Sequence, residues 1–136
     1  MKIEIRYISK SGNTKKAADK IAETLNIEAK TVNEPVDGAD ILFLGGALYA
    51  GKIHKKLKIF IESLDDKVKK VAVFGTSATE NSIYPEVKKH LDEKGVPVFN
   101  DNFQCPGKFL FICRKRPNAE DLENAAVFAR KIIQEN

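Results

Sequence analysis

The residues with the most distinctive chemistry form one short loop near the start of the chain, SKSGNT at residues 9–14. The loop separates an apolar segment from a segment whose apolar residues recur at helical spacing. Its hydroxyls and backbone N–H groups would therefore gather at a helix N-terminus. Such donors suit the phosphate of a monoester, and Gly12 would let the backbone approach that phosphate closely. Ser11 or Asn13 could instead cap the helix, which is a common role for these residue types.

Two familiar phosphate-binding loops do not occur in the chain. The GxxxxGK[ST] pattern is missing, and no GxGxxG follows the first apolar segment. The sequence therefore lacks the motifs that would chiefly indicate nucleoside triphosphate hydrolysis.

The elements that would position the loop follow from the alternation of apolar runs and helical periodicity. Strands are expected at residues 3–8, 27–32, 39–46, 68–75 and 96–103. Helices are expected at residues 12–25, 57–64, 84–95 and 119–134, the last with Asn118 as its N-cap. This order predicts an α/β fold, a doubly wound five-stranded parallel sheet in a three-layer α/β/α arrangement.

Ligands of such folds bind beyond the carboxyl ends of the strands. In this chain those ends are expected at residues 9–14, 45–51, 75–82 and 104–108, all rich in small or hydroxyl-bearing residues. The sequence therefore predicts one binding site at that edge of the sheet.

Composition limits the remaining classes of function. The 136 residues suit a single domain, 1–136, and the net charge of +4 comes from lysines that we interpret as dispersed among acids on a solvated surface. No base-stacking aromatics interleave with the lysines, so we expect no nucleic-acid binding. No apolar run approaches the ~20 residues that span a bilayer, and the N-terminal residues do not resemble a signal peptide. A cytoplasmic protein with reduced cysteines is the expectation.

With these residues in view, the chain resembles the flavodoxin family over essentially its full length. The family's loop, (Ser/Thr)-x-(Ser/Thr)-Gly-Asn-Thr, matches residues 9–14, and residues 43–64 resemble the segment that packs against the flavin. The resemblance implies that FMN is the cofactor and that its phosphate is bound by Ser9, Lys10 (through its backbone), Ser11, Gly12, Asn13 and Thr14. It implies that the flavin ring is bordered by Ala47, Leu48, Tyr49, Ala50 and Gly51, with Tyr49 flat on the ring. It implies that the polar edge of the flavin contacts the loop containing Gly75, Thr76, Ser77 and Thr79.

Two departures from the family pattern bear on function. The loop at residues 75–82 has no second aromatic before Tyr84, so one face of the flavin could stay open to a substrate. Typical flavodoxins are acidic, whereas here the flavin-binding loop is followed by a basic cluster, Lys52, His54, Lys55, Lys56 and Lys58. These cations could stabilise the anionic reduced flavin and make its potential less negative, or they could form an ordinary solvated helix face.

The segment at residues 105–118 leaves two readings open. Its apolar run, 109–112, could form an extra edge strand or a docking surface beside the flavin. Cys105 is expected near the crevice but without a general base, which argues against nucleophilic catalysis.

The leading functional hypothesis is an FMN-binding electron-transfer protein that serves a reductase and an acceptor enzyme by transient docking. The alternative is a flavodoxin-like FMN oxidoreductase acting directly on a small molecule such as a quinone. An interaction module without flavin would not need so many converging donors. A receiver-type signalling domain would need acids where Ser9 and Gly45 stand.

Overall fold

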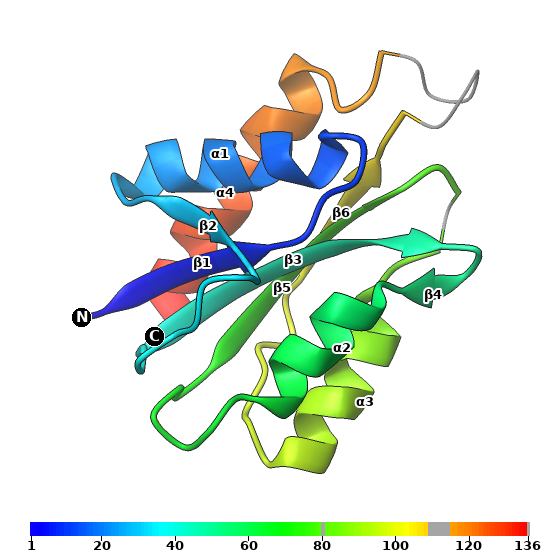
Figure 1. Ribbon diagram of the computed structural model, residues 1–136. Helices are drawn as coiled ribbons and strands as arrows, with labels where there is room; N and C mark the ends of the chain where they lie inside the picture. Colours follow the sequence, from blue (N-terminus) through cyan, green and yellow to red (C-terminus); the bar gives the residue numbers. More distant parts are fainter. Residues whose placement is uncertain (80, 109–114, 136) are drawn as a thin grey trace.

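The computed structural model describes residues 1–79, 81–108 and 115–135. Its central sheet has five parallel strands in the order β2-β1-β3-β5-β6 (Figure 1). The strands are β1 (Ile3–Tyr7), β2 (Ala29–Thr31), β3 (Ile41–Tyr49), β5 (Val71–Ser77) and β6 (Phe103–Pro106). A further two-residue strand, β4 (Lys52–Ile53), pairs antiparallel with the end of β3 and was not predicted.

Helices cover both faces of the sheet, as the doubly wound fold requires. On one face lie α1 (Asn13–Leu25) and α4 (Ala119–Glu135), and on the other lie α2 (Lys55–Glu62) and α3 (Tyr84–Lys94) (Figure 1). The predicted fold class, a parallel sheet between two layers of helices, is confirmed.

Alternate residues of the central strands supply two separate cores. Ile5, Phe43 and Phe74 face α1 and α4, whereas Leu42 and Leu44 face α2 and α3, and all five are fully buried. Because β3 is buried on both faces, its sequence reads as one continuous apolar run rather than an alternating one. Burial of each large apolar side chain contributes roughly 1.5–3 kcal/mol, so the two cores hold the sheet edge in place.

The prediction that two glycines end the third strand is wrong. Gly45 and Gly46 lie inside β3, where Gly45 is in register with both Tyr7 and Phe74. A Cβ at Gly45 would come within 2.2 Å of the Phe74 ring, and one at Gly46 would come within 2.8 Å of Leu57. These glycines allow close packing of side chains over β3, and the strand continues to Tyr49.

The last predicted strand is also misplaced. Residues 96–102 contribute only an isolated bridge between Val98 and Val71, and β6 begins at Phe103. The Pro97 carbonyl accepts the Val71 N–H at this bridge, but Pro97 has no N–H with which to extend the pairing. The turn-forming residues 100–102 separate the bridge from β6.

The remaining elements lie close to their predicted positions. Helix α1 begins one residue after its expected start, and helix α2 begins two residues before its expected start. Strand β2 is shorter than expected. Helix α3 ends at Gly95, whose φ of 73° suits glycine at a helix C-terminus. Asn118 Oδ1 accepts the N–H of Asp121 at 2.9 Å, as expected of the residue before α4.

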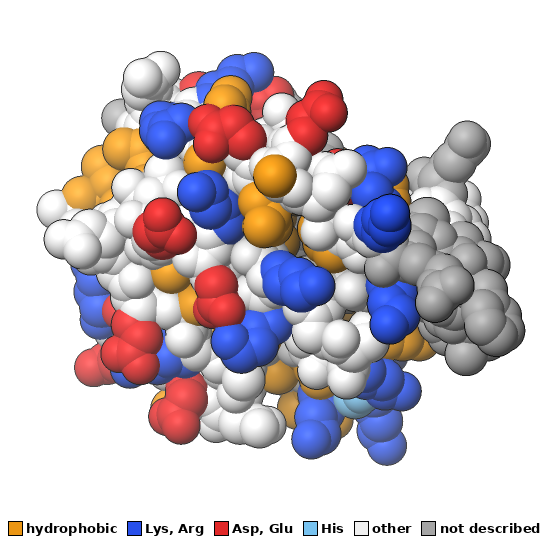
Figure 2. All heavy atoms as spheres, turned by 90° about the horizontal axis from the view of Figure 1, so that it is seen from above, with side chains coloured by type: hydrophobic (Ala, Val, Ile, Leu, Met, Phe, Trp, Pro, Cys, Tyr) orange, Lys and Arg blue, Asp and Glu red, His pale blue; other side chains and the backbone are white. Residues whose placement is uncertain are grey.

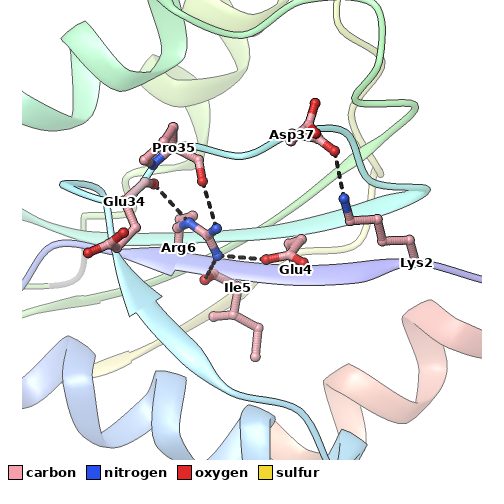
Figure 3. Close-up of polar contacts among 7 residues, drawn as sticks. All are labelled: Lys2, Glu4, Ile5, Arg6, Glu34, Pro35 and Asp37. Carbon is pink, nitrogen blue, oxygen red and sulfur yellow. Dashed lines mark hydrogen bonds and ion pairs between the residues drawn. The ribbon is translucent and has the colours of Figure 1, made fainter.

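A buried arginine fixes the loop that follows β2. Arg6 is only 3% exposed, and its guanidinium donates to Glu4 Oε1 at 2.8 Å and to the carbonyls of Glu34 and Pro35 at 2.9 and 2.8 Å (Figure 3). Buried charges persist when they are paired and hydrogen-bonded in this way. The contact therefore positions the loop at the edge of the sheet next to β1.

Candidate functional site

A cavity of about 290 Å³ opens at the carboxyl ends of the parallel strands. It is lined by residues from all four expected segments. These lining residues are Ser11, Asn13, Ala47, Leu48, Tyr49, Ala50, Gly51, Thr76, Ser77, Ala78, Thr79, Asn81, Gly107 and Lys108. The fold therefore brings together loops that are separated by up to about a hundred residues in the sequence.

The first loop turns sharply into α1 at Gly12. Its φ of 90° is in the left-handed region, and no heavy atom lies within 4 Å of the position that a Cβ would take. The Gly12 N–H donates to Ser9 Oγ at 3.0 Å, and Asn13 Nδ2 donates to Ser11 Oγ at 3.1 Å. Among the described residues no side chain caps α1, so the alternative in which Ser11 or Asn13 caps the helix is wrong.

Hydrogen bonds tie the first loop to the three neighbouring strand ends. The hydroxyls of Thr14 and Thr76 lie 2.9 Å apart in a buried contact between α1 and β5. Asn13 Nδ2 donates to the carbonyl of Lys108 at 2.7 Å, beyond β6. The Lys10 N–H donates to Tyr49 Oη at 3.3 Å, beyond β3. These contacts hold the donors of the first loop in a fixed position relative to the cavity.

Tyr49 stands at the edge of the cavity with cationic and aromatic neighbours. The Lys10 ammonium lies 4.7 Å from the centroid of the Tyr49 ring, and the His54 ring meets it edge-on at 5.8 Å. Burial raises the pKa of the Tyr49 hydroxyl, although its hydrogen bond from Lys10 acts the other way. The hydroxyl therefore stays protonated near neutral pH. Positive φ values of 51° and 78° at Ala50 and Gly51 turn the chain back into β4.

The opposite side of the cavity, residues 76–79 and 81, carries a small alanine together with hydroxyl and amide side chains. Ser77 Oγ and Thr79 Oγ1 lie 3.0 Å apart, and the Asn81 N–H donates to Thr79 Oγ1 at 3.2 Å. No aromatic side chain lines this side among the described residues. Tyr84 belongs to α3, and its hydroxyl donates to the Phe99 carbonyl at 2.8 Å, so it takes no part in the lining.

Not every predicted site residue lines this cavity. Ser9, Lys10 and Gly12 line a neighbouring hollow, of about 540 Å³, on the β2 side of the loop. Thr14 is only 1% exposed and contacts Thr76, and Gly75 lies against Gln104 and Ile83. Ala78, Asn81, Gly107 and Lys108 also line the cavity; they lie in the segments expected to form the site but were not among the residues predicted to bind the cofactor. Their small or polar character and their position at strand ends were the available signals.

His54 joins the neighbouring hollow to α2. Its Nδ1 accepts the Lys56 N–H at 3.0 Å and so caps α2. Burial, followed by the positive charges of Lys10 and Lys56, lowers the pKa of His54. The imidazole is therefore neutral near pH 7, which the capping hydrogen bond requires of the accepting nitrogen.

Cys105 is a buried free thiol outside the cavity lining. Burial is the main cause that raises its pKa to about 12. Such a thiol stays protonated and is a poor nucleophile. Cys113 and the apolar run at 109–112 lie outside the described residues.

Two features are absent from the part of the chain that the structure describes. This part contains no group of three or more His, Cys, Asp or Glu side chains that could hold a metal ion. It also contains no helix of the length and apolarity that a membrane span demands.

Comparison with known proteins identifies the family. A family model for a flavodoxin domain matches residues 4–118. The chain belongs to the flavodoxin family. It is 37% identical over 122 residues to the flavodoxin-like domain-containing protein BilS of Clostridioides difficile, an alignment that covers 79% of this chain and 67% of BilS.

Solved structures share the flavodoxin fold at lower identity. A flavodoxin from the domain Archaea superposes with a TM-score of 0.81 at 18% identity, covering 99% of this chain and 98% of the other. Oxidised Flavodoxin 1 from Bacillus cereus superposes with a TM-score of 0.78 at 21% identity, covering 100% and 99%.

Proposed function

We propose that this protein binds FMN in the cavity and transfers electrons between partner proteins. The observation that carries the proposal is the convergence of four strand ends on one cavity beside a glycine-containing, hydroxyl-rich loop. Membership of the flavodoxin family and the flavoprotein neighbours support a flavin cofactor, and FMN is the one whose phosphate matches this donor set.

The donors of the first loop fit a phosphate. The N-terminus of α1 has no side-chain cap among the described residues, and the space beside Gly12 is open. A helix N-terminus binds anions through its backbone N–H groups and its dipole. We assign the phosphate to Ser9, Ser11, Asn13 and the backbone of residues 10–14, with Thr14 held against Thr76 in a supporting position.

The flavin ring would lie along Tyr49, Ala50 and Gly51, with the hydroxyls of Thr76, Ser77 and Thr79 at its polar edge. Tyr49 Oη now accepts the Lys10 N–H, so that N–H becomes available to a phosphate only when Tyr49 moves away from it. FMN, when bound, supplies the redox chemistry by accepting and donating electrons. The protein contributes orientation, exclusion of water from one side of the cavity and the local charge.

The phosphate assignment is tested by comparing FMN with riboflavin, which lacks the phosphate. Ser11→Ala removes one hydroxyl donor at an exposed position, and a hydrogen bond to a charged group contributes roughly 1.5–3 kcal/mol. We therefore expect the Kd for FMN to rise about 10- to 100-fold while the Kd for riboflavin stays unchanged. Flavin fluorescence titration measures both constants.

The matched control is Thr24→Ala, which removes a hydroxyl near the other end of α1, where Thr24 donates to the Lys20 carbonyl. It should leave both constants unchanged. Equal losses of FMN and riboflavin in Ser11→Ala would contradict the phosphate assignment. Failure of the wild-type protein to take up FMN at micromolar concentrations would contradict the proposed function itself.

One observation favours a second candidate function, an FMN oxidoreductase that acts on a small molecule such as a quinone. The side of the cavity formed by residues 76–81 has no aromatic to cover the flavin among the described residues. Steady-state oxidation of a pyridine nucleotide by a quinone, with no other protein present, would favour the enzyme. Turnover only when a redox protein is added would favour the electron carrier.

A further inference from the structure

The positive charges of this chain are concentrated in three segments that contain no acidic residue. These segments are 5–18, 41–61 and 102–119, and each ends where the next Asp or Glu occurs. Together they hold 12 of the 23 lysines and arginines and none of the 19 acids. The interpretation of lysines dispersed among acids is therefore wrong for this part of the chain. The rest of the chain is net acidic even though the whole protein is net positive.

The fold brings parts of these three segments, as far as the structure describes them, to the same end of the molecule. They contain the first loop, the end of β3 with β4 and α2, and the end of β6. Figure 2 shows the consequence on one face: the side toward which the strands of Figure 1 point displays blue side chains without red ones, and the red ones lie elsewhere on that face. The cavity opens at this positively charged end.

Six lysines define this surface, which we call the lysine rim. They are Lys10, Lys16, Lys52, Lys55, Lys56 and Lys58, all exposed. None of the six forms an ion pair with any residue that the structure describes, whereas Lys88, Lys131 and Lys67 elsewhere pair with Asp92, Asp101 and Asp37. The rim therefore carries positive charge that no ion pair with a described residue neutralises, and the carboxylate of Glu86 shares a hollow with Lys52, Lys55 and Lys58 without pairing with them.

The hollow beside the first loop concentrates part of this charge. Lys10, Lys56 and His54 face it together with Lys15, and its described lining includes no carboxylate. Of these residues only Lys15 forms an ion pair with a described residue, between its Nζ and Asp19 Oδ2 at 2.7 Å. Lys10 and Lys56 therefore place two positive charges, neither in an ion pair with a described residue, beside this hollow. An external anion that approached the hollow would be attracted by both charges.

An exposed apolar side chain lies within the same surface. Ile59 of α2 is 53% exposed and is one of three large hydrophobic residues with high exposure among the described residues. It follows Lys58 directly and shares a shallow depression with Lys56. A small anion would gain nothing from Ile59, whereas a protein interface combines apolar contacts with charge complementarity.

We propose that the lysine rim is the docking surface for a redox protein with an acidic face, which it holds next to the mouth of the cavity. This inference rests on the proposed function, because the docked partner would exchange electrons through the cofactor in that cavity. Opposite charges steer such an encounter and raise its rate, and the effect weakens as salt shortens the Debye length from about 30 Å at 0.01 M to about 10 Å at 0.1 M.

The test uses two redox proteins of opposite charge as probes, a strongly acidic plant-type ferredoxin and a basic cytochrome c. Stopped-flow mixing with the FMN-loaded protein gives the second-order rate of electron exchange at increasing salt. We expect the rate with ferredoxin to fall with salt and the rate with cytochrome c to rise. The opposite salt dependences would overturn the proposal.

Charge reversal locates the surface. The triple variant Lys52→Glu, Lys55→Glu, Lys58→Glu should lower the ferredoxin rate at least tenfold at low salt. Lys55 and Lys58 lie in the first turn of α2, where a negative charge interacts favourably with the helix dipole, so the helix should still form in the variant. The matched control reverses three exposed lysines that form no ion pair with described residues and lie away from the rim: Lys30→Glu, Lys69→Glu and Lys94→Glu. Equal rates for the two triple variants would overturn the proposal.

A second readout separates this inference from the proposed function because it needs no cofactor. Amide NMR shifts of the ¹⁵N-labelled protein, titrated with oxidised ferredoxin at low salt, should change along β4 and α2. Shifts confined to other surfaces would overturn the docking site even if FMN binds. If FMN does not bind and these shift changes still appear on the rim, the result contradicts the proposed function but supports the rim as the docking surface for an acidic protein. Rim-dependent binding of anionic lipid vesicles without any effect of ferredoxin would replace the protein partner by a membrane surface.

Discussion

The two sides of the cavity differ in how they are built. The end of β3 presents an aromatic wall, residues 49–51, in which Tyr49 is backed by Lys10 and His54. The end of β5 and the loop after it present a hydroxyl wall, residues 76–79 and 81, in which Ser77 and Thr79 bond each other and the backbone N–H groups of Thr79 and Asn81. One wall offers contact area, and the other offers hydrogen-bonding groups held by a local network.

This difference indicates how the two sides of one cavity can contribute different interactions to the binding of a planar ligand. A large aromatic contributes through stacking and buried area, which tolerates a range of ligand polarity. Hydroxyls contribute through directed hydrogen bonds, which demand fixed positions. The aromatic wall should therefore determine affinity for the ring, and the hydroxyl wall should determine its orientation and the stability of the site.

The largest effect on binding of the flavin ring is expected from removing the aromatic wall. Tyr49→Ala should weaken both FMN and riboflavin, because stacking contributes about 1–3 kcal/mol per aromatic platform in comparable systems. Tyr49→Phe keeps the ring and removes the hydroxyl that accepts the Lys10 N–H, so it should bind FMN at least as tightly as the wild type. Flavin fluorescence titration measures these constants. Unchanged riboflavin affinity in Tyr49→Ala would show that the ring lies elsewhere.

A somewhat smaller effect, on folding, is expected at the base of the hydroxyl wall. Thr76→Val leaves the Thr14 hydroxyl buried without its partner, which costs about 1–3 kcal/mol of unfolding free energy. Urea titration followed by circular dichroism measures the loss. The double variant Thr14→Val, Thr76→Val removes both hydroxyls and should recover part of it. A double variant whose loss equals the sum of the single losses would mean that the two hydroxyls do not interact.

The smallest effect is expected from the support of the aromatic wall by His54. Because the pKa of His54 is lowered on folding, the unfolded chain binds more protons between that lowered value and the ordinary 6.5. The contribution of His54 to stability is therefore complete above about pH 6.5 and is lost as the pH falls through this window. Urea unfolding at several pH values measures the loss.

The control for this pH dependence is His54→Asn, which keeps a capping side chain that does not titrate. Its unfolding free energy should fall less steeply than that of the wild type between pH 6.5 and 5. An identical dependence of the unfolding free energy on pH in the two proteins would show that His54 is not the titrating group.

The aromatic wall and the first loop could be predicted from the sequence because each lies in one contiguous motif. The order of strands and helices followed from apolar periodicity for the same reason. The extension of β3 past Gly45 could not be predicted, because it depends on the Phe74 ring packing over that position. The β3–β4 hairpin depends on the positive φ values at Ala50 and Gly51, and alanine gives no sequence signal for such a turn.

The contacts that complete the site also could not be predicted from the sequence. The bond from Asn13 to the Lys108 carbonyl joins residues 95 positions apart, and nothing local in either segment specifies its partner. Burial of Thr14 against Thr76 likewise follows from the packing of α1 over β5. Motif matching found the chemical groups, but the tertiary fold decides which of them face the cavity.

The bond between Asn13 and Lys108 also has a consequence for biosynthesis. During synthesis α1 leaves the ribosome before the loop after β6, to which Asn13 is hydrogen-bonded, and before α4, which packs against Ala18 and Ile21. Contacts between distant segments form late in folding because a long loop must close first. A nascent chain that has not yet reached α4 would present the hydroxyl-rich loop without a finished pocket, so uptake of the proposed cofactor should wait until that helix has been made.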